Sequence, residues 1–418
     1  MITQLISASR TEFDLTDPSH QASVLQLAER FLQELGQGLE AGEDLKNKLR
    51  AEGVPMEARM AGLLASSKKW LLQNKQPKKV AVVFAMWGEQ NRLLPNSPDN
   101  PNGEDSLVAK LEQLDWAAKD SKIDWHLYAV DDGCPHGSGD IAKRVASKHS
   151  LGEKVSVLSL ADALPASDGP LHDLASADDS RKAGAIILGA MGAINDGSDA
   201  VIYTDADNSV HLGQIGLLLQ PYIDAGAPVV LGDRKHADSV LVKEGARWGI
   251  GIKVLRHMQR MIGHAVFSQG ILDTQAAFKL YDSSLLKEII AEPTVYDFSF
   301  DTDWILAALK RGVDIRQVPF AFIDSAAESA SITQGPMTTW ETLLFGLEKQ
   351  VRKYGFAEGD AAAMGAVLRE EIKDYRDLEK VIDHLPPELE AAGEEDFGNP
   401  AVMSADAMRS WLRARVAS

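Results

Sequence analysis

The stretch VIYTDADNSVHL, residues 201–212, joins a run of apolar residues to two aspartates that lie one residue apart. The apolar run is typical of a strand buried on both faces, and Asp205 and Asp207 follow at its carboxyl end. Such a pair forms either an ordinary polar turn or a site that holds a metal ion and a phosphate group. The surrounding pattern of strands and helices decides between these two interpretations.

Four more apolar runs resemble this one, and helical patterns separate all five. The other predicted strands are 80–86, 125–132, 154–160 and 228–233, and the predicted helices cover about 106–119, 140–149, 181–194 and 212–224. Strands that alternate with helices predict an α/β fold with a Rossmann-like, mostly parallel sheet and helices on both faces. Because ligands of such sheets bind beyond the carboxyl ends of the strands, we expect the functional residues there.

Both ends of the chain have a helical pattern without convincing strands. Val24, Leu27 and Phe31 recur at helical spacing near the start, and Ser404 is a suitable N-cap for a helix over 405–416 near the end. We expect that last helix to pack on its own protein rather than on a membrane surface. The sequence thus predicts a helical extension over 1–76, a sheet domain over 77–336 and a second helical extension over 337–418.

Composition excludes several classes of protein. The chain has 418 residues and a net charge of −18, which argues against nucleic acid as the main partner. Its one cysteine, Cys134, cannot form an internal disulfide, and this fits a cytoplasmic location. We expect neither a signal peptide nor a transmembrane span, because no apolar run approaches the length that a membrane requires.

Acidic side chains follow most of the predicted strands. Glu89 follows the first strand, Asp131 and Asp132 end the second, and Asp233 and Arg234 end the fifth. Each alone is most simply a polar turn, because Asp and Gly are common where a strand becomes a loop. Their coincidence at one predicted edge of the sheet favours a binding site.

The spacing of Asp205 and Asp207 has a mechanical meaning. In an extended chain, residues i and i+2 face the same side, so both carboxylates can reach one cation. Mg²⁺ and Mn²⁺ prefer oxygen ligands and complete their shells with water and phosphate oxygens. The D-x-D pair alone is a weak signal, but no Walker loop, G-x-G-x-x-G, H-E-x-x-H or G-x-S-x-G pattern offers a competing site.

Seven segments occur in the order found in a known family. Over residues 78–323 the chain resembles the family 2 glycosyltransferases of the GT-A fold, and within them the dolichyl-phosphate glucosyltransferases and dolichyl-phosphate mannose synthases. The last two segments are the longest and the most specific. The segments are VVFAMWGEQNRL (82–93), AVDDGCPHGSGD (129–140), SRKAGAIILGA (180–190), VIYTDADNSV (201–210), VVLGDR (229–234), DTQAAFKLYD (273–282) and FSFDTDWILAALKRGVDIRQVPF (298–320).

The resemblance implies a donor site and a general base. It implies that Asp205 and Asp207 hold Mg²⁺ or Mn²⁺ and the diphosphate of a UDP-glucose or GDP-mannose class donor. Inverting members need a carboxylate that deprotonates the acceptor hydroxyl, and three candidates stay unranked: Asp273, Asp301 and Asp303. The residues implied to bind the donor are Ala85, Trp87, Glu89, Asp131, Asp132, Lys182, Asp205, Arg234 and Gln275.

Several positions depart from the family pattern. Ala85 and Gly88 stand where the family usually has Pro and Asn, and Cys134 stands where it has Ser. We therefore expect the contacts to the nucleotide base to differ. The acceptor stays open between a soluble compound and a polyprenyl phosphate. The polar segment 325–334 follows the last matched strand, and we expect it to close over the donor or the acceptor.

Two other functions remain open. A sugar-1-phosphate nucleotidyltransferase would share the sheet and the acidic metal site, but it needs a Gly-rich basic loop that WGEQNRLLPN (87–96) does not provide. A non-catalytic nucleotide-sugar-binding protein on the same fold, with a homodimer formed through the helical ends, is compatible with the altered motifs.

Overall fold

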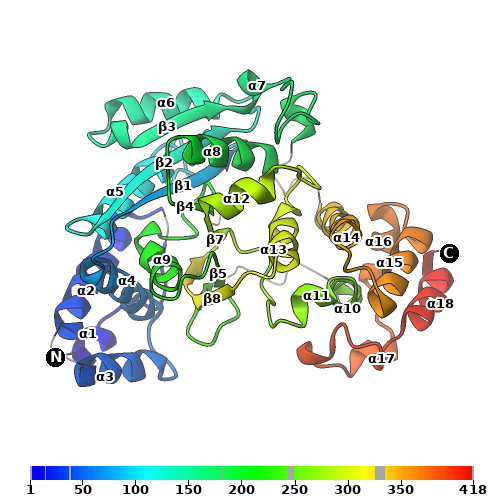
Figure 1. Cartoon of the computed structure of the whole chain (residues 1–418). Helices are drawn as coiled ribbons and strands as arrows, with labels where there is room; N and C mark the ends of the chain where they lie inside the picture. Colours follow the sequence, from blue (N-terminus) through cyan, green and yellow to red (C-terminus); the bar gives the residue numbers. More distant parts are fainter. Residues whose placement is uncertain are drawn as a thin grey trace. The chain divides into compact units, whose positions relative to one another are not determined.

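The computed structural model describes residues 2–14, 16–36, 39–180, 182–242, 249–324 and 335–416, and the chain divides into two compact units (Figure 1). Unit 1 comprises Met1–Lys243, Ala276–Ala291 and Val313–Ala327. Unit 2 comprises Glu244–Gln275, Glu292–Gly312 and Glu328–Ser418. The segment 325–334, which we expected to close over the donor or acceptor, lies outside the described residues.

Unit 1 contains a seven-stranded sheet in the order β3-β2-β1-β4-β7-β5-β8. Strand β1 pairs in parallel with β2 and β4, and β5 pairs in parallel with β8. Only β7 runs antiparallel, between β4 and β5, and it was not predicted as a strand. The predicted α/β class with a mostly parallel sheet is confirmed. The strands are β1 (Lys78–Met86), β2 (Ile123–Asp131), β3 (Val155–Ser159), β4 (Ala200–Thr204), β5 (Val229–Asp233), β7 (Phe278–Asp282) and β8 (Ile315–Pro319).

Helices cover both faces of this sheet. One face is packed by α5 (Ser106–Ala118), α6 (Ser138–Lys148) and α9 (Ile215–Asp224), and the other by α7 (Leu160–Ala163), α8 (Ala183–Asn195) and α12 (Ser283–Ile290). Alternate residues of β1 divide between the two faces, as expected for a strand. Val82 and Phe84 belong to the core cluster that contains Leu111 of α5. Val83 instead faces α8, where a Cβ on Gly189 would lie 2.4 Å from its Cγ1 atom.

The N-terminal helices belong to unit 1. They are α1 (Ile2–Ser7), α2 (Pro18–Leu35), α3 (Leu39–Arg50) and α4 (Met56–Gln73). Val24, Leu27 and Phe31 are buried, as their spacing predicted. They share a core cluster with the small parallel sheet of β6 (Val240–Val242) and β9 (Ala321–Ile323).

Unit 2 is helical in its described part. Its helices are α10 (Ile252–Ile262), α11 (His264–Phe267), α13 (Phe300–Lys310), α14 (Pro336–Lys353), α15 (Gly359–Glu371), α16 (Tyr375–Ile382), α17 (Pro387–Glu390) and α18 (Ala405–Val416). Residues 244–275 and 292–312 are grouped with the C-terminal helices, so the units divide the chain differently from the three predicted segments. The boundaries of those segments stay a prediction.

The last helix packs on its own unit. The Ser404 hydroxyl accepts a hydrogen bond from the Ala407 amide at 3.3 Å, which confirms the predicted N-cap. Arg409 pairs with Glu370 at 3.0 Å, and α18 contacts α15 and α16. The expectation that this helix packs on the protein is therefore confirmed.

Candidate active site

The predicted strand ends in unit 1 share one edge of the sheet. Strands β1, β2 and β4 are mutually parallel, and β5 has the same direction because β7 is antiparallel to both β4 and β5. Glu89, Asp132, Asp205 and Arg234 therefore all follow the carboxyl ends of strands at that edge. This is the edge at which sheets of this type bind their ligands.

Asp205 and Asp207 lie in a bend just beyond β4. The strand ends at Thr204 and the chain bends over 206–209, so the pair is not part of the extended strand. The Ser209 amide donates to Asp207 Oδ1 at 3.0 Å, and Lys182 Nζ donates to Asp205 Oδ1 at 2.5 Å. Lysine therefore pairs with one carboxylate of the two.

Because of this unequal pairing, the pKa values of the two aspartates shift in opposite directions. Burial opposes ionisation of Asp205, but the charges of Lys182 and Arg234 hold its pKa below the usual range. Burial raises the pKa of Asp207 to about 7, and the negative charges of Asp205 and Glu104 reinforce that rise. Asp207 and its acidic neighbours thus form an acidic side of the site. The positive side chains nearby compensate its negative charge only in part.

A divalent cation fits the acidic side. No group of three or more His, Cys, Asp and Glu among the described residues is arranged to hold a metal alone. Two carboxylates that leave room for phosphate oxygens are nevertheless a common protein contribution to Mg²⁺ binding. A cation between Asp205 and Asp207 would also relieve the repulsion that raises the pKa of Asp207.

Lys182 is held in an unusual backbone conformation. Its φ of 88° and ψ of −46° are rare for a residue with a side chain and cost on the order of 1–3 kcal/mol. The Lys182 amide donates to Asp132 Oδ2 at 2.8 Å, which fixes the start of α8 against the end of β2. Two predicted donor-binding residues are thereby linked, and the lysine ammonium is directed to Asp205.

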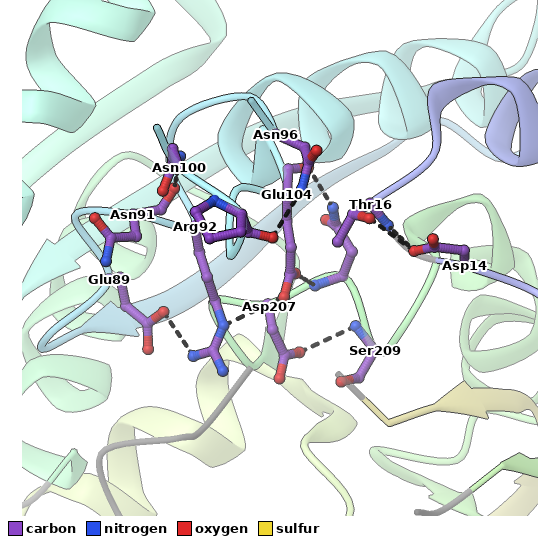
Figure 2. Close-up of polar contacts among 12 residues, drawn as sticks. Asp14, Thr16, Glu89, Asn91, Arg92, Asn96, Asn100, Glu104, Asp207 and Ser209 are labelled. Carbon is purple, nitrogen blue, oxygen red and sulfur yellow. Dashed lines mark hydrogen bonds and ion pairs between the residues drawn. The ribbon is translucent and has the colours of Figure 1, made fainter. Parts of the chain in front are cut away.

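Glu89 belongs to a buried ion-pair network that sequence reasoning missed. Figure 2 shows the Arg92 guanidinium between the carboxylates of Glu89 and Glu104. Arg92 Nη1 donates to Glu89 Oε2 at 2.9 Å, and Arg92 Nε lies 3.3 Å from Glu104 Oε1. Burial raises the pKa of Glu89, although Arg92 opposes the shift. The available signal was the spacing of Glu89 and Arg92 in one segment, WGEQNRL.

Asp131, at the end of β2, uses its carboxylate to bind the backbone of the loop that follows. Asp131 accepts from the Cys134 amide at 2.7 Å and from the Gly139 amide at 2.6 Å. The Cys134 sulfur in turn accepts from the Gly88 amide at 3.2 Å, which joins this loop to the one after β1. Asp131 therefore fixes the loop backbone, and its predicted contact with the donor stays a prediction.

Trp87, Ala85 and Arg234 lie around this edge. The Trp87 residue is 43% exposed, and its ring is nearly perpendicular to that of His136, with 6.0 Å between the ring centres. Ala85 is part of β1 and pairs with Val130. The Arg234 guanidinium lies 5.0 Å from the centre of the Phe322 ring.

The remaining predicted residues belong to unit 2. Gln275 Nε2 donates to Thr302 Oγ1 at 3.2 Å, which brings the DTQ segment to the start of α13. Asp273, Asp301 and Asp303 are all buried. Asp303 accepts from the Thr294 amide at 3.1 Å, and burial raises its pKa. These contacts indicate a structural role for Asp303.

His211, close behind the aspartate pair, belongs to no group of three or more potential metal-ligating side chains among the described residues. Its Nδ1 accepts from the Gly213 amide at 2.9 Å, and its ring meets Trp116 edge-on at 6.5 Å. Burial lowers the pKa of His211 to about 3, so the ring is neutral at physiological pH.

Comparison with known proteins supports the resemblance drawn from the motifs. No family model matches the sequence. The chain is 24% identical over 202 residues to a polyprenol monophosphomannose synthase of Mycolicibacterium smegmatis, covering 48% of this chain and 67% of that protein. It is 24% identical over 237 residues to an undecaprenyl-phosphate mannosyltransferase of Micrococcus luteus, covering 56% of this chain and 85% of that protein.

The predicted resemblance to the family 2 glycosyltransferases is confirmed. The predicted class of enzyme, a glycosyltransferase, is confirmed with it. A solved structure of glucosyl-3-phosphoglycerate synthase from Mycobacterium tuberculosis, in complex with Mn²⁺, UDP and glucosyl-3-phosphoglycerate, overlaps with a TM-score of 0.46. The overlap has 13% sequence identity and covers 74% of this chain and 88% of that chain. None of the helices formed by the described residues has the length and apolar character needed to cross a membrane.

Proposed function

We propose that this glycosyltransferase moves a hexose from a nucleoside-diphosphate donor to a hydroxyl or phosphate acceptor, with inversion and with a divalent cation at Asp205 and Asp207. The observation that carries the proposal is the unequal pairing of these two carboxylates at the carboxyl edge of the sheet. Lys182 compensates Asp205, whereas burial and acidic neighbours raise the pKa of Asp207 to about 7. An ordinary polar turn that binds no ligand would not be stabilised by placing Asp207 beside other carboxylates.

The residues of unit 1 divide the work of holding the donor. When bound, Mg²⁺ or Mn²⁺ would neutralise the charge that develops on the departing diphosphate. Lys182 supplies a second positive charge beside Asp205, within reach of a phosphate that binds there. The exposed ring of Trp87 provides a stacking surface for the nucleotide base.

The general base is proposed to be one of three buried carboxylates: Asp273, Asp301 or Asp303. A base must come within hydrogen-bond distance of the acceptor hydroxyl. One oxygen of Asp303 already accepts a hydrogen bond from the Thr294 amide, so only its other oxygen could take that role.

The names of the two relatives suggest which substrates to test first. Both are named for the transfer of mannose to a polyprenyl phosphate, so GDP-mannose with a polyprenyl phosphate is the first combination. UDP-glucose with soluble hydroxyl acceptors is the second. The cytoplasmic location and the homodimer stay predictions.

The test is donor turnover with and without Mn²⁺, measured as release of nucleoside diphosphate. The wild-type protein should release GDP or UDP only when Mn²⁺ or Mg²⁺ is present, and Asp207→Ala should lower the rate at least about a hundredfold. Asp140→Ala is the matched control, because the Asp140 side chain is 77% exposed in α6. Equal rates for Asp207→Ala and wild type would contradict the proposed metal site.

A second measurement distinguishes the proposed glycosyltransferase from a sugar-1-phosphate nucleotidyltransferase. Release of pyrophosphate from a nucleoside triphosphate and a sugar 1-phosphate would identify a nucleotidyltransferase and overturn the proposed reaction.

A further inference from the structure

Three buried polar side chains hold the backbone that follows β4. We name Glu104, Lys110 and Gln113 the polar seam; Glu104 lies two residues before the start of α5, and the other two lie one helical turn apart on it. Lys110 Nζ donates to the carbonyl oxygen of Asp207. The other members of the seam bind the next residues along the same segment.

Glu104 and Gln113 extend this contact on both sides. Glu104 Oε2 accepts from the Asn208 amide at 2.9 Å, and its carbonyl accepts from Asn208 Nδ2 at 2.8 Å. Gln113 Oε1 accepts from the Leu212 amide at 2.8 Å. The seam therefore binds the main chain at 207, 208 and 212, directly after the aspartate pair.

The burial of Lys110 has an energetic cost that stability alone does not explain. Its side chain is fully buried, and its ammonium lies 5.6 Å from the centre of the Phe84 ring. Among the described residues, its one hydrogen bond is to the Asp207 carbonyl. Replacing buried charges by apolar residues of similar volume is often neutral or stabilising, so stability is a weak reason for a lysine at this position.

We propose that Lys110 is a positioning residue that fixes the Asp207 main chain, so that the Asp207 carboxylate is held ready for the divalent cation of the donor complex. The inference rests on the proposed function, because it assigns Lys110 a role at the proposed metal site. Lys110 binds the main chain rather than the carboxylate, so it acts through Asp207 and needs no contact with the donor. Loss of the bond would free the bend over 206–209 without removing a metal ligand.

The test measures Mn²⁺ binding in the presence of UDP by isothermal titration calorimetry. Lys110→Met removes the ammonium and keeps an unbranched side chain, and we expect at least tenfold weaker Mn²⁺ binding. Lys110→Gln retains a hydrogen-bond donor and should recover at least threefold of that loss. Lys143→Met, which removes a lysine that is 55% exposed on α6, should bind Mn²⁺ as the wild type does.

A second titration separates positioning from general damage to the fold. UDP binding without metal should be unchanged in Lys110→Met, whereas a purely structural defect would weaken UDP binding with and without Mn²⁺ alike. If Lys110→Met does not give a cooperative thermal transition, Lys110→Gln decides the question. It should then bind Mn²⁺ at least threefold more weakly than the wild type.

Asp207→Ala is the reference variant that distinguishes the metal site itself from the positioning role of Lys110. Mn²⁺ binding that is lost in Asp207→Ala but unchanged in both Lys110 variants would overturn the positioning role and leave the metal site intact. Mn²⁺ binding that survives in Asp207→Ala would overturn the proposed metal site, and the role of Lys110 with it.

Discussion

Two lysines reach the bend after β4 from opposite faces of the sheet, and they differ in almost every physical respect. Lys182, at the start of α8, is 29% exposed and pairs with the Asp205 carboxylate at 2.5 Å. Lys110, on α5, is fully buried and donates to the Asp207 main chain. Lys182 therefore pairs with a carboxylate that could also bind a ligand. Lys110 instead binds a main-chain carbonyl oxygen and so holds the backbone in place.

The two faces of the sheet therefore contribute differently at the carboxyl edge. On the α8 side, Lys182 pairs with Asp205, and the proposed function has it turn to a donor phosphate. The α5 side offers fixed geometry, through the polar seam and through the ion pairs of Arg92 with Glu89 and Glu104. Variants on the α5 side should change stability or positioning, whereas variants on the α8 side should change donor affinity with little effect on stability.

The largest expected effect is on the α5 side. Arg92→Met removes the guanidinium between two buried carboxylates, and leaving buried charge uncompensated typically costs about 3–5 kcal/mol in the free energy of unfolding. Urea unfolding measures the change. Arg92→Lys retains the charge and should lose less, and a loss below about 1 kcal/mol in Arg92→Met would show that the network contributes little.

A smaller effect in a different quantity is expected on the α8 side. Lys182→Met should raise the KM for the donor about tenfold, which corresponds to ~1.4 kcal/mol of lost donor binding. Its free energy of unfolding should stay within about 0.5 kcal/mol of the wild type, because the ion pair with Asp205 is partly exposed. A variant with unchanged KM and reduced stability would reverse the proposed division between the two faces.

The smallest effect is a pH dependence on the α5 side, at His211. The pKa of His211 is about 3 in the folded protein, below its ordinary value of 6.5, so the unfolded chain binds the proton more tightly. The resulting stability is fully present above pH 6.5 and is lost as the pH falls toward 3.

Urea unfolding at two pH values measures this contribution. Between pH 6.5 and pH 5.5 the wild type should lose about 1 kcal/mol that His211→Gln does not lose. Equal losses in the two proteins would mean that His211 is not held neutral against Trp116 and the Gly213 amide.

The sequence predicted the parallel part of the fold well, because buried parallel strands are continuous apolar runs. The strands that became β1, β2, β3, β4 and β5 were all expected within two residues of their observed ends. Strand β7 was not, because FKLYD carries a lysine at its second position and an aspartate at its end, and lacks the continuous apolar run of the other strands. Lys279 is fully buried there and donates to the Ala276 carbonyl, a tertiary arrangement that local sequence does not indicate.

The candidate site was predictable to the extent that its residues follow strands. Asp205, Glu89 and Lys182 were found from strand ends and motif order. Arg92 and Lys110 were missed, because a charged residue within a helical or loop segment is ordinarily solvated and its burial depends on packing. The polar residues of α5 at 106, 110 and 113 lie at helical spacing on a buried face, and that pattern was the available signal.

Asp205 and Asp207 are proposed to hold a divalent cation together with the donor diphosphate. The most direct measurement is a crystal structure of the protein with Mn²⁺ and UDP, using the anomalous signal of manganese. We expect a manganese peak bonded to carboxylate oxygens of Asp205 and Asp207 and to UDP phosphate oxygens, with Lys182 Nζ turned to a phosphate. Bound UDP with no manganese peak at this pair, and with the Lys182 to Asp205 bond intact, would contradict the proposed metal site.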